Sequence, residues 1–265
     1  MTPILTIAGS DCSAGAGLQA DLKTFQHFGL HGLTAVTCIV SETANIVHRV
    51  EAVFVEMVAD QIQLMLSAFP VTVVKTGMLG SAEIVSCVAR IFRDHPDIRL
   101  VIDPVMVAST GASLLDSAAI AIYMEELLPL ATIITPNLPE AETLLGRSIP
   151  SLSEMEAAAK ELSERYQCAI LLKGGHLGTG DCTDVLLENG IFHRFSSPRL
   201  DVRASHGTGC TLAAALAANI ALGKSLPASV AKAKAFLNQT LATSYSFQTP
   251  GGSEIHALNQ GTFRV

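Results

Sequence analysis

The chain has 265 residues, of which 49% are hydrophobic, and a formal net charge of −7 at pH 7. This length and hydrophobic content suffice for one large α/β unit, so we expect a single domain over residues 1–265. The acidic balance argues against a nucleic acid or membrane partner and favours a small molecule. No signal-peptide pattern opens the chain and no apolar run is long enough to span a membrane, so we expect a cytoplasmic protein.

Short apolar runs alternate with segments that have helical spacing of apolar residues. The runs are continuous, as in strands buried on both faces, and occupy residues 4–8, 33–40, 71–74, 100–102, 131–134 and 169–172. The helical segments are 18–28, 55–68, 82–93, 117–128 and 152–166, and Ser153 with Glu156 has the form of a capping box. This alternation predicts an α/β fold: a three-layer α/β/α sandwich with a mostly parallel central sheet.

Residues 178–195 interrupt this rhythm. Two short apolar segments, 184–187 and 191–195, flank Glu188-Asn189-Gly190. An Asn-Gly pair between strand patterns is typical of a tight β-hairpin turn. We therefore predict a small β-hairpin flap near one end of the sheet.

The segment 205–223 combines a glycine turn with a buried helix. It begins Ser205-His206-Gly207-Thr208-Gly209-Cys210 and continues into a run rich in alanine and leucine. Glycines that expose backbone N–H groups, followed by the positive end of a helix, predict an anion-binding cradle suited to phosphate. In the first helical turn, Cys210 is expected to have a pKa below the free value of about 8.5. The alternative is a simple glycine turn before a core helix.

Polar residues and glycines also follow each predicted strand, where a parallel sheet of this kind binds its ligand. They are Gly9-Ser10-Asp11, Glu42, Lys75-Thr76-Gly77-Met78, Asp103-Pro104-Val105-Met106, residues 135–140 and Lys173-Gly174-Gly175-His176. Six loops that converge on one face are stronger evidence for a site than any single motif.

Two of these loops indicate a metal and a phosphate. Asn137 and Glu140 are three residues apart where a helix begins, so with Asp103 they offer hard oxygen ligands for Mg²⁺. Equally, Asn137 could cap the helix while Glu140 is solvated. Lys173 could bind a phosphate as a point charge, or it could be a surface lysine beside a turn. His206, like the histidine at 176, receives no role.

Two other nucleotide-binding motifs are disfavoured by the sequence. Residues 15–20 formally match the dinucleotide pattern Gly-x-Gly-x-x-Gly/Ala, which would indicate an oxidoreductase. The pattern starts six residues after Gly9 rather than directly after the strand, and the acidic residue Glu42 comes too late. The P-loop pattern Gly-x-x-x-x-Gly-Lys-Ser/Thr does not occur in the sequence.

Six motifs in order carry a family resemblance. AGSDCSAGAGLQADLKTF, VKTGMLG, DPVM, TPNLPEA, LLKGGH and HGTGCTLAAALAA span nearly the whole chain. Together they resemble the hydroxymethylpyrimidine/phosphomethylpyrimidine kinases of thiamine biosynthesis, in the ribokinase-like superfamily, whose sugar kinases have Asp where HGTGC has Cys. The resemblance implies a ribokinase-like fold and ATP- and Mg²⁺-dependent phosphorylation of 4-amino-5-hydroxymethyl-2-methylpyrimidine, then of its monophosphate. We also expect a homodimer.

The resemblance also implies roles for individual residues. Gly207, Thr208 and Gly209 would form the anion hole, and Cys210 would activate the hydroxyl group. Lys173, Asn137 and Thr208 would bind ATP, with Lys234 in a helix beneath the nucleotide, and Asp103 and Glu140 would support Mg²⁺. The pyrimidine pocket would be lined by Gly9, Asp11, Ala16, Glu42, Met78 and Val105.

The sequence departs from the family pattern at two positions. Cys12 replaces the usual Pro, and Glu42 replaces the Gln typical of pyrimidine-specific enzymes. A carboxylate matches an aminopyrimidine edge only if Glu42 or the ring nitrogen carries a proton, so we expect pH-dependent binding unless Glu42 faces solvent. A pyridoxal-type vitamin kinase and a non-catalytic binder on the same fold remain the alternatives.

Overall fold

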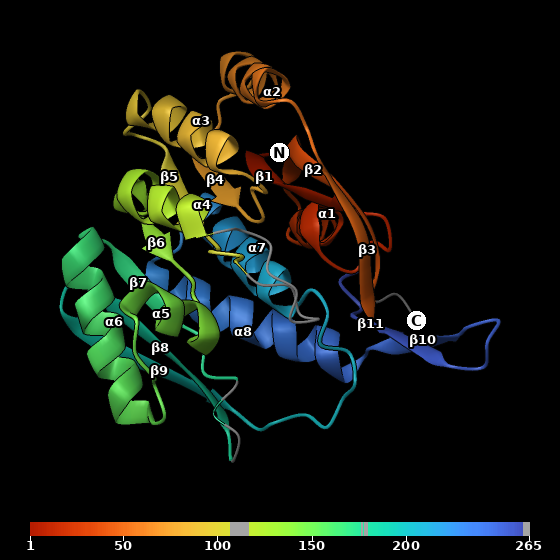
Figure 1. The fold of residues 1–265 in the computed structure, drawn as a ribbon. Helices are drawn as coiled ribbons and strands as arrows, with labels where there is room; N and C mark the ends of the chain where they lie inside the picture. Colours follow the sequence, from red (N-terminus) through yellow and green to blue (C-terminus); the bar gives the residue numbers. More distant parts are fainter. Residues whose placement is uncertain (107–116, 176, 178–179, 262–265) are drawn as a thin grey trace.

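The computed structural model describes residues 1–106, 117–175, 177 and 180–261, so the histidine at 176 lies outside the described residues. Within them, nine strands form one sheet in the order β3-β2-β1-β4-β5-β6-β7-β8-β9 (Figure 1). The strands are β1 (Pro3–Asp11), β2 (His31–Thr43), β3 (Ile46–Ala52), β4 (Val73–Thr76), β5 (Arg99–Ile102), β6 (Ile133–Ile134), β7 (Ala169–Leu172), β8 (Cys182–Glu188) and β9 (Ile191–Ser197). The six strands from β2 to β7 in that order are parallel. At one edge β3 pairs antiparallel with β2, and at the other the antiparallel hairpin of β8 and β9 joins the sheet through β7.

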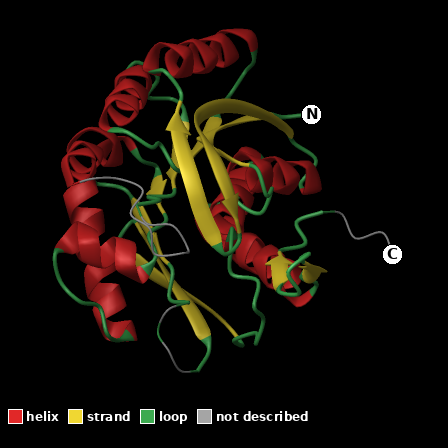
Figure 2. Ribbon diagram, turned by 45° about the vertical axis from the view of Figure 1, so that its right-hand side comes forward, coloured by secondary structure: helices red, strands yellow, loops and turns green. Residues whose placement is uncertain are grey.

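Helices cover both faces of this sheet (Figure 2). They are α1 (Gly17–His27), α2 (Val55–Ala68), α3 (Ala82–Arg93), α4 (Ser117–Ile122), α5 (Leu138–Leu145), α6 (Leu152–Tyr166), α7 (Thr208–Ala221) and α8 (Leu226–Ala242). After α4, the helix continues as a π-helical turn, Tyr123–Leu127, and a 3₁₀ turn, Leu128–Leu130. The predicted three-layer sandwich with a mostly parallel sheet is confirmed.

The strands contribute to a different core on each face. In β5, Leu100 and Ile102 pack with α2, α3, α4 and α6, whereas Val101 between them packs with α1, α7 and α8. Successive side chains of a strand point to opposite faces, so burial on both faces requires an unbroken apolar run. This explains why the sequence shows continuous rather than alternating strands.

Helix α7 lies in the core on the face of the sheet that α1 and α8 also cover, and it is buried along most of its length. Residues 213–218 are completely buried, and α7 contacts α1, α8, β4 and β5. Alanine side chains are small, so neighbouring elements can approach this helix closely while helix propensity stays high. The packing fixes the N-terminus of α7 at the carboxyl end of the sheet.

Several local details differ from expectation. The predicted hairpin is confirmed at one end of the sheet, with Asn189 and Gly190 of its turn at positive φ, and β8 pairs with β7 so that the hairpin continues the main sheet. Helix α6 is capped by Ser151, whose hydroxyl accepts the Glu154 N–H at 3.3 Å, and not by the predicted Ser153. The largely exposed strand β3 was not predicted, nor was the separate hairpin of β10 (Tyr245–Gln248) and β11 (Glu254–Ala257).

None of the helices within the described ranges is both long and apolar enough to cross a membrane. Whether residues 1–265 form a single domain stays a prediction. The features that matter for the site are the aligned carboxyl ends of the parallel strands and the N-terminus of α7 beside them.

Candidate active site

A cavity of about 450 Å³ opens at the carboxyl ends of the strands. The predicted site residues that line it are Gly9, Asp11, Ala16, Glu42, Met78, Asp103, Val105, Asn137, Glu140, Lys173, Gly207, Thr208, Gly209 and Cys210. Lys75, His206 and Val47 of β3 also line it, and the sequence assigned none of these a role. The structure thus brings the predicted residues together around one space, with Lys234 as the exception.

Backbone hydrogen bonds between neighbouring strands hold the strand ends in register. Asp103 N–H donates to the Thr76 carbonyl at 3.0 Å, and Lys173 N–H donates to the Pro136 carbonyl at 2.9 Å. Asn137 and Lys173 form an isolated parallel bridge beyond β6 and β7. Residues that are far apart in the sequence therefore emerge side by side at one edge of the sheet.

Lys173 lies between two buried carboxylates at what we call the phosphate end of the cavity, defined by Lys173, Asp103 and Glu140. Its ammonium is 2.9 Å from Asp103 Oδ1 and 3.9 Å from Glu140 Oε2. Burial alone would lower the pKa of Lys173, but the two carboxylates outweigh it and raise that pKa. Burial raises the pKa of Glu140 to about 7, opposed by Lys173 and reinforced by Asp103.

Asn137 and Glu140 cap a helix and also line the cavity, so helix capping and a place in the site, which the sequence left as alternatives, occur together. The Asn137 side chain accepts the Glu140 N–H at 2.9 Å, and Glu140 Oε2 accepts the Asn137 N–H at 2.8 Å, a reciprocal capping box at the start of α5. Glu140 is only 4% exposed, so the alternative in which Glu140 is solvated is wrong. Capping fixes both side chains while leaving them on the cavity wall.

Close packing requires a glycine at position 207 of the anion cradle, whereas a side chain at position 209 would make ordinary contacts. Gly207 has φ 81° and lies against the carbonyl of Gly15, where a Cβ atom would collide with the backbone. A Cβ on Gly209 would lie 3.4 Å from the Lys173 ammonium and 3.7 Å from Asp103 Oδ2. The N-terminus of α7, which favours anions, therefore adjoins the phosphate end.

The prediction of a lowered pKa for Cys210 is wrong in this ligand-free structure. Burial raises the pKa of the Cys210 thiol to about 11, and the carboxylates of Asp103 and Asp21 act in the same direction. The positive charge of Lys75 and the Gly17 N–H lower it, but not by enough. Desolvation of the thiolate outweighs the helix dipole, because the dipole acts as only about half a charge.

Lys75 is a buried cation beside this thiol. Its side chain is 0% exposed, and its ammonium lies 2.9 and 3.1 Å from the two oxygens of Asp21, which also accepts the Thr6 hydroxyl. Burial lowers the pKa of Lys75, but Asp21 outweighs this and raises it. The position of Lys75 after a strand was visible in the sequence, whereas Asp21, 54 residues away, gave no signal as its partner.

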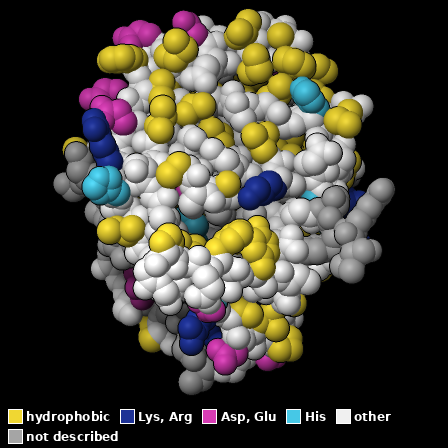
Figure 3. Space-filling view, turned by 90° about the vertical axis from the view of Figure 1, so that its right-hand side faces the viewer, with side chains coloured by type: hydrophobic (Ala, Val, Ile, Leu, Met, Phe, Trp, Pro, Cys, Tyr) yellow, Lys and Arg dark blue, Asp and Glu magenta, His cyan; other side chains and the backbone are white. Residues whose placement is uncertain are grey.

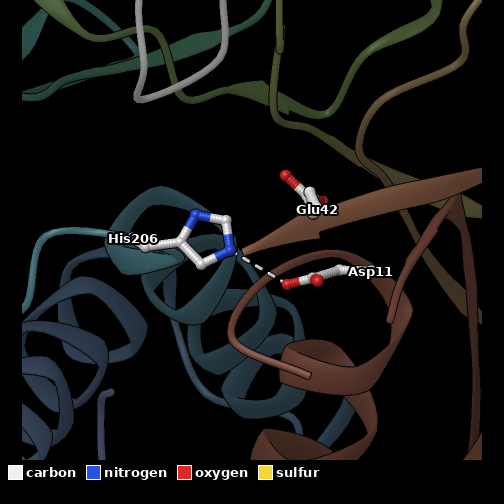
Figure 4. A group of neighbouring side chains, drawn as sticks. All are labelled: Asp11, Glu42 and His206. Atoms are coloured by element: carbon white, nitrogen blue, oxygen red, sulfur yellow. Dashed lines mark hydrogen bonds and ion pairs between the residues drawn. The ribbon is translucent and has the colours of Figure 1, made fainter. Parts of the chain in front are cut away.

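Asp11, Glu42 and His206 also line the cavity and form a cluster that we call the ring end (Figure 4). His206 Nε2 is 2.9 Å from Asp11 Oδ2. The thiol of Cys12 donates to the Glu42 carbonyl at 3.3 Å and accepts the Glu42 N–H at 3.4 Å. The two positions that depart from the family pattern, Cys12 and Glu42, are therefore in direct contact.

Lys234 lies outside the cavity lining. Its ammonium donates to Asp184 Oδ2 at 2.7 Å, and Asp184 Oδ1 accepts the Gly174 N–H at 3.0 Å. Lys234 therefore supports the loop after β7 through Asp184. Its predicted contact with ATP stays a prediction.

Comparison with known proteins gives a consistent picture. A family model described as phosphomethylpyrimidine kinase matches residues 11–254. The hydroxymethylpyrimidine/phosphomethylpyrimidine kinase of Haemophilus influenzae is 41% identical over 90% of this chain and 90% of its own length. The thiamine biosynthesis bifunctional protein ThiED of Geobacter sulfurreducens is 41% identical over 96% of this chain, which spans 52% of that longer protein.

A solved structure with the same architecture is that of the pyridoxal kinase from Staphylococcus aureus in complex with ADP. It superimposes with a TM-score of 0.88 and 33% sequence identity, covering 98% of this chain and 94% of that chain. A pyridoxal kinase therefore has the same fold as this chain, whose sequence relatives include a hydroxymethylpyrimidine/phosphomethylpyrimidine kinase.

Proposed function

Because the chain belongs to the phosphomethylpyrimidine kinase family, we propose that it transfers a phosphoryl group from ATP to 4-amino-5-hydroxymethyl-2-methylpyrimidine and then to the resulting monophosphate. The observation that carries the proposal is one cavity that joins three kinds of group: a cation and glycine cradle, a thiol, and a polar ring end. Phosphoryl transfer depends mainly on positioning and charge stabilisation, and this cavity offers both.

The phosphate end would hold the polyphosphate of ATP. Lys173 supplies a fixed positive charge, and the backbone N–H groups from Gly207 to Cys210 are at the N-terminus of α7, where anions are favoured. Asp103 and Glu140 are hard oxygen donors on the cavity wall and fit a site for Mg²⁺, held directly or through water. Mg²⁺ would neutralise charge on the phosphates when bound.

Cys210 would act as the general base. It lines the same cavity, and its thiolate form would take the proton of the hydroxymethyl group as the oxygen attacks the phosphorus. The raised pKa of the free thiol means that most molecules hold a neutral thiol at pH 7. Lys75 offsets this by favouring the thiolate, so we assign it a positioning and electrostatic role behind Cys210.

A pyridoxal-type vitamin kinase is the second candidate function. It is favoured by the similarity to a pyridoxal kinase structure and by Glu42, which is an acceptor-only group when ionised. The deciding experiment incubates the protein with ATP, Mg²⁺ and either hydroxymethylpyrimidine or pyridoxal, and reads product masses. Mono- and diphosphate of the pyrimidine would support the first proposal, whereas phosphate on pyridoxal alone would support the second.

We further propose a homodimer in the cytoplasm, where ATP is available. Large apolar side chains are exposed along β2, β3 and α2, and hydrophobic residues gather on the upper part of this face (Figure 3). They are Ile39, Ile46, Val50, Phe54, Met57 and Leu64. A monomer rarely exposes so large an apolar group of residues. Sedimentation of the wild type and of Phe54→Asp tests this, and a monomeric wild type would contradict it.

A further inference from the structure

Three ionisable groups at the ring end form a cluster of two carboxylates and one imidazole. One nitrogen of His206 and one oxygen each of Asp11 and Glu42 lie within 4.8 Å of one another (Figure 4). The three residues come from different parts of the fold: the end of β1, the end of β2 and the loop before α7. Such a cluster can determine which protonation state of a bound nitrogen heterocycle is preferred.

Asp11 is fixed as an anion. Its Oδ1 accepts the Ser13 N–H at 2.7 Å, and its Oδ2 accepts the N–H groups of Gly15 at 3.0 Å and Ala16 at 2.7 Å. Burial alone would raise the pKa of Asp11, but the hydrogen bonds from His206 and these backbone groups lower it well below its usual range. Asp11 therefore stays ionised and cannot turn away from His206.

His206 is held between the two carboxylates. In addition to the bond with Asp11, its ring packs so closely on the first loop that a Cβ atom on Gly15 would lie 2.6 Å from His206 Cδ2. Burial lowers the pKa of His206, but Asp11 and then Glu42 outweigh it and raise that pKa above 6.5. Both carboxylates therefore favour the protonated form of the imidazole.

Glu42 receives opposing influences from this pair. Burial and the charge of Asp11 raise its pKa, and the charge of His206 lowers it. Around Glu42, Cys12 and Cys38 are free cysteines, Arg49 of β3 is exposed and paired with Glu51, and Lys23 is bonded to the Ala14 carbonyl. Among the residues that the structure describes, His206 is the cation in the cluster with Glu42.

We propose that His206 is a specificity-determining residue: held by Asp11, it tunes Glu42 to read a ring with an amino group beside a basic ring nitrogen. This inference rests on the proposed function and names the recognition chemistry of that site. A carboxylate accepts two hydrogen bonds from such an edge only when the ring nitrogen is protonated, and a carboxylic acid pairs with the neutral ring. In both cases the complex retains one proton, and His206 decides at what pH Glu42 gives it up.

The same three groups have the chemical types of a metal site. A metal on His206 Nε2 would have to replace its bond to Asp11, whose Oδ2 also accepts two backbone N–H groups. The packed geometry thus favours a proton-sharing cluster. Binding experiments repeated with EDTA check this point, and a loss of the effect with EDTA would overturn the inference.

The test removes the charge of His206 and keeps its hydrogen bond. Gln places an amide N–H near the position of Nε2, so His206→Gln can still donate to Asp11. The pKa of Glu42, followed by ¹³C NMR in the ligand-free protein and identified with Glu42→Gln, should rise by about one unit or more, since an opposite charge within about 4–6 Å is removed. An unchanged Glu42 pKa would overturn the proposal.

Binding gives the second readout. Calorimetry of hydroxymethylpyrimidine without ATP should show that the affinity of His206→Gln declines at a pH about one unit higher than in the wild type, with less proton uptake at pH 7. Glu42→Gln and the double variant should have identical, flat profiles. If Glu42 shifts by NMR but the pyrimidine profile does not, His206 does not determine specificity. If the pyrimidine binds with the expected profiles yet is never phosphorylated, only the proposed function fails.

Discussion

The two ends of the cavity have the same charge composition, but their cations respond differently to pH. Each places one cation between two carboxylates: Lys173 between Asp103 and Glu140, and His206 between Asp11 and Glu42. The pKa of Lys173 is raised above 10.5, so the phosphate end keeps its cation at every physiological pH. At the ring end, the cation itself titrates.

This difference suits two recognition tasks. A polyphosphate is an anion at all relevant pH values, so its partner should be a permanent cation. A nitrogen heterocycle changes its donors and acceptors with pH, so a titrating partner can select one form of it. Substitutions at the two ends should therefore differ in their effect on turnover and in its dependence on pH.

Cys210 lies in the same cavity as both ends, and its removal should have the largest effect. Replacing a general base typically costs about 10²- to 10⁴-fold in rate, so Cys210→Ser should lower kcat within that range. Cys210→Asp should be milder, because a carboxylate can accept the same proton. Because the thiol has a pKa of about 11, wild-type kcat should rise with pH above neutrality as thiolate forms.

Mass spectrometry provides the control for this role. A phosphorylated or acylated Cys210 trapped during turnover would indicate a covalent nucleophile, and full activity in the Ser variant would show that the thiol only packs against substrate. Lys75→Met should shift the rise of kcat to higher pH and lower kcat near neutrality, since the positive charge that favours the thiolate is lost.

The phosphate end should show the next largest effect. Lys173→Ala and Glu140→Ala should each lower turnover by about 10²- to 10³-fold at saturating ATP and Mg²⁺, as losses of preorganised charge do. Circular dichroism should show that both variants fold. Near wild-type turnover in either variant would remove that residue from the proposed machinery.

Glu140→Gln is the matched variant, since an amide oxygen can still accept the Asn137 N–H and preserve the capping box. The pKa of Glu140 is raised to about 7, so its ionised form gains population as pH rises through 7. The apparent affinity for Mg²⁺ should therefore increase with pH in the wild type and stay flat in Glu140→Gln. Parallel profiles in the two proteins would show that Glu140 does not support the metal.

The fold could be predicted where local pattern and packing agree. The continuous apolar runs and helical spacing located α2, α3 and α6 to the residue because these elements bury a periodic face. The exposed edge strand β3 has no such face, so its sequence IVHRVEA gave no comparable signal. Ser151 and Ser153 are both acceptable caps locally, and only the final position of the helix start selects Ser151.

In the candidate site, positions at strand ends could be predicted from the sequence, but partners that are distant in the chain could not. Positions after buried strands must converge at one edge of a parallel sheet, which placed Asp103, Asn137 and Lys173 together. Long-range partners were not visible: Asp11 and His206 are 195 residues apart, and no local rule pairs them. The pKa of Cys210 was mispredicted for the same reason, because burial by distant elements decides it.

A smaller effect is expected at the ring end. Glu42→Gln should tighten hydroxymethylpyrimidine binding and flatten its dependence on pH. The pKa of Glu42 is raised, so its protonated form is lost as pH rises through that value, and the apparent affinity of the wild type should weaken over the same interval. The measurement is kcat/KM against pH for hydroxymethylpyrimidine and pyridoxal in both proteins. Identical profiles with unchanged discrimination would show that Glu42 does not read the ring.

The smallest effect on catalysis is expected for Lys234, which serves neither end directly. Its ammonium is bound to Asp184 at 2.7 Å outside the cavity lining, so the structure gives it no direct contact with the phosphates. Lys234→Met should leave the KM for ATP within about twofold of the wild-type value. It also leaves the buried Asp184 carboxylate without its cation, and removing one partner of a buried ion pair costs about 3 to 5 kcal/mol of stability. The double variant with Asp184→Asn should recover part of that loss, because the amide can still accept the Gly174 N–H without a buried charge. Urea unfolding and ATP kinetics measured on the same samples separate the two roles. A large rise in the KM for ATP with unchanged stability would return Lys234 to the nucleotide site that the family resemblance implies.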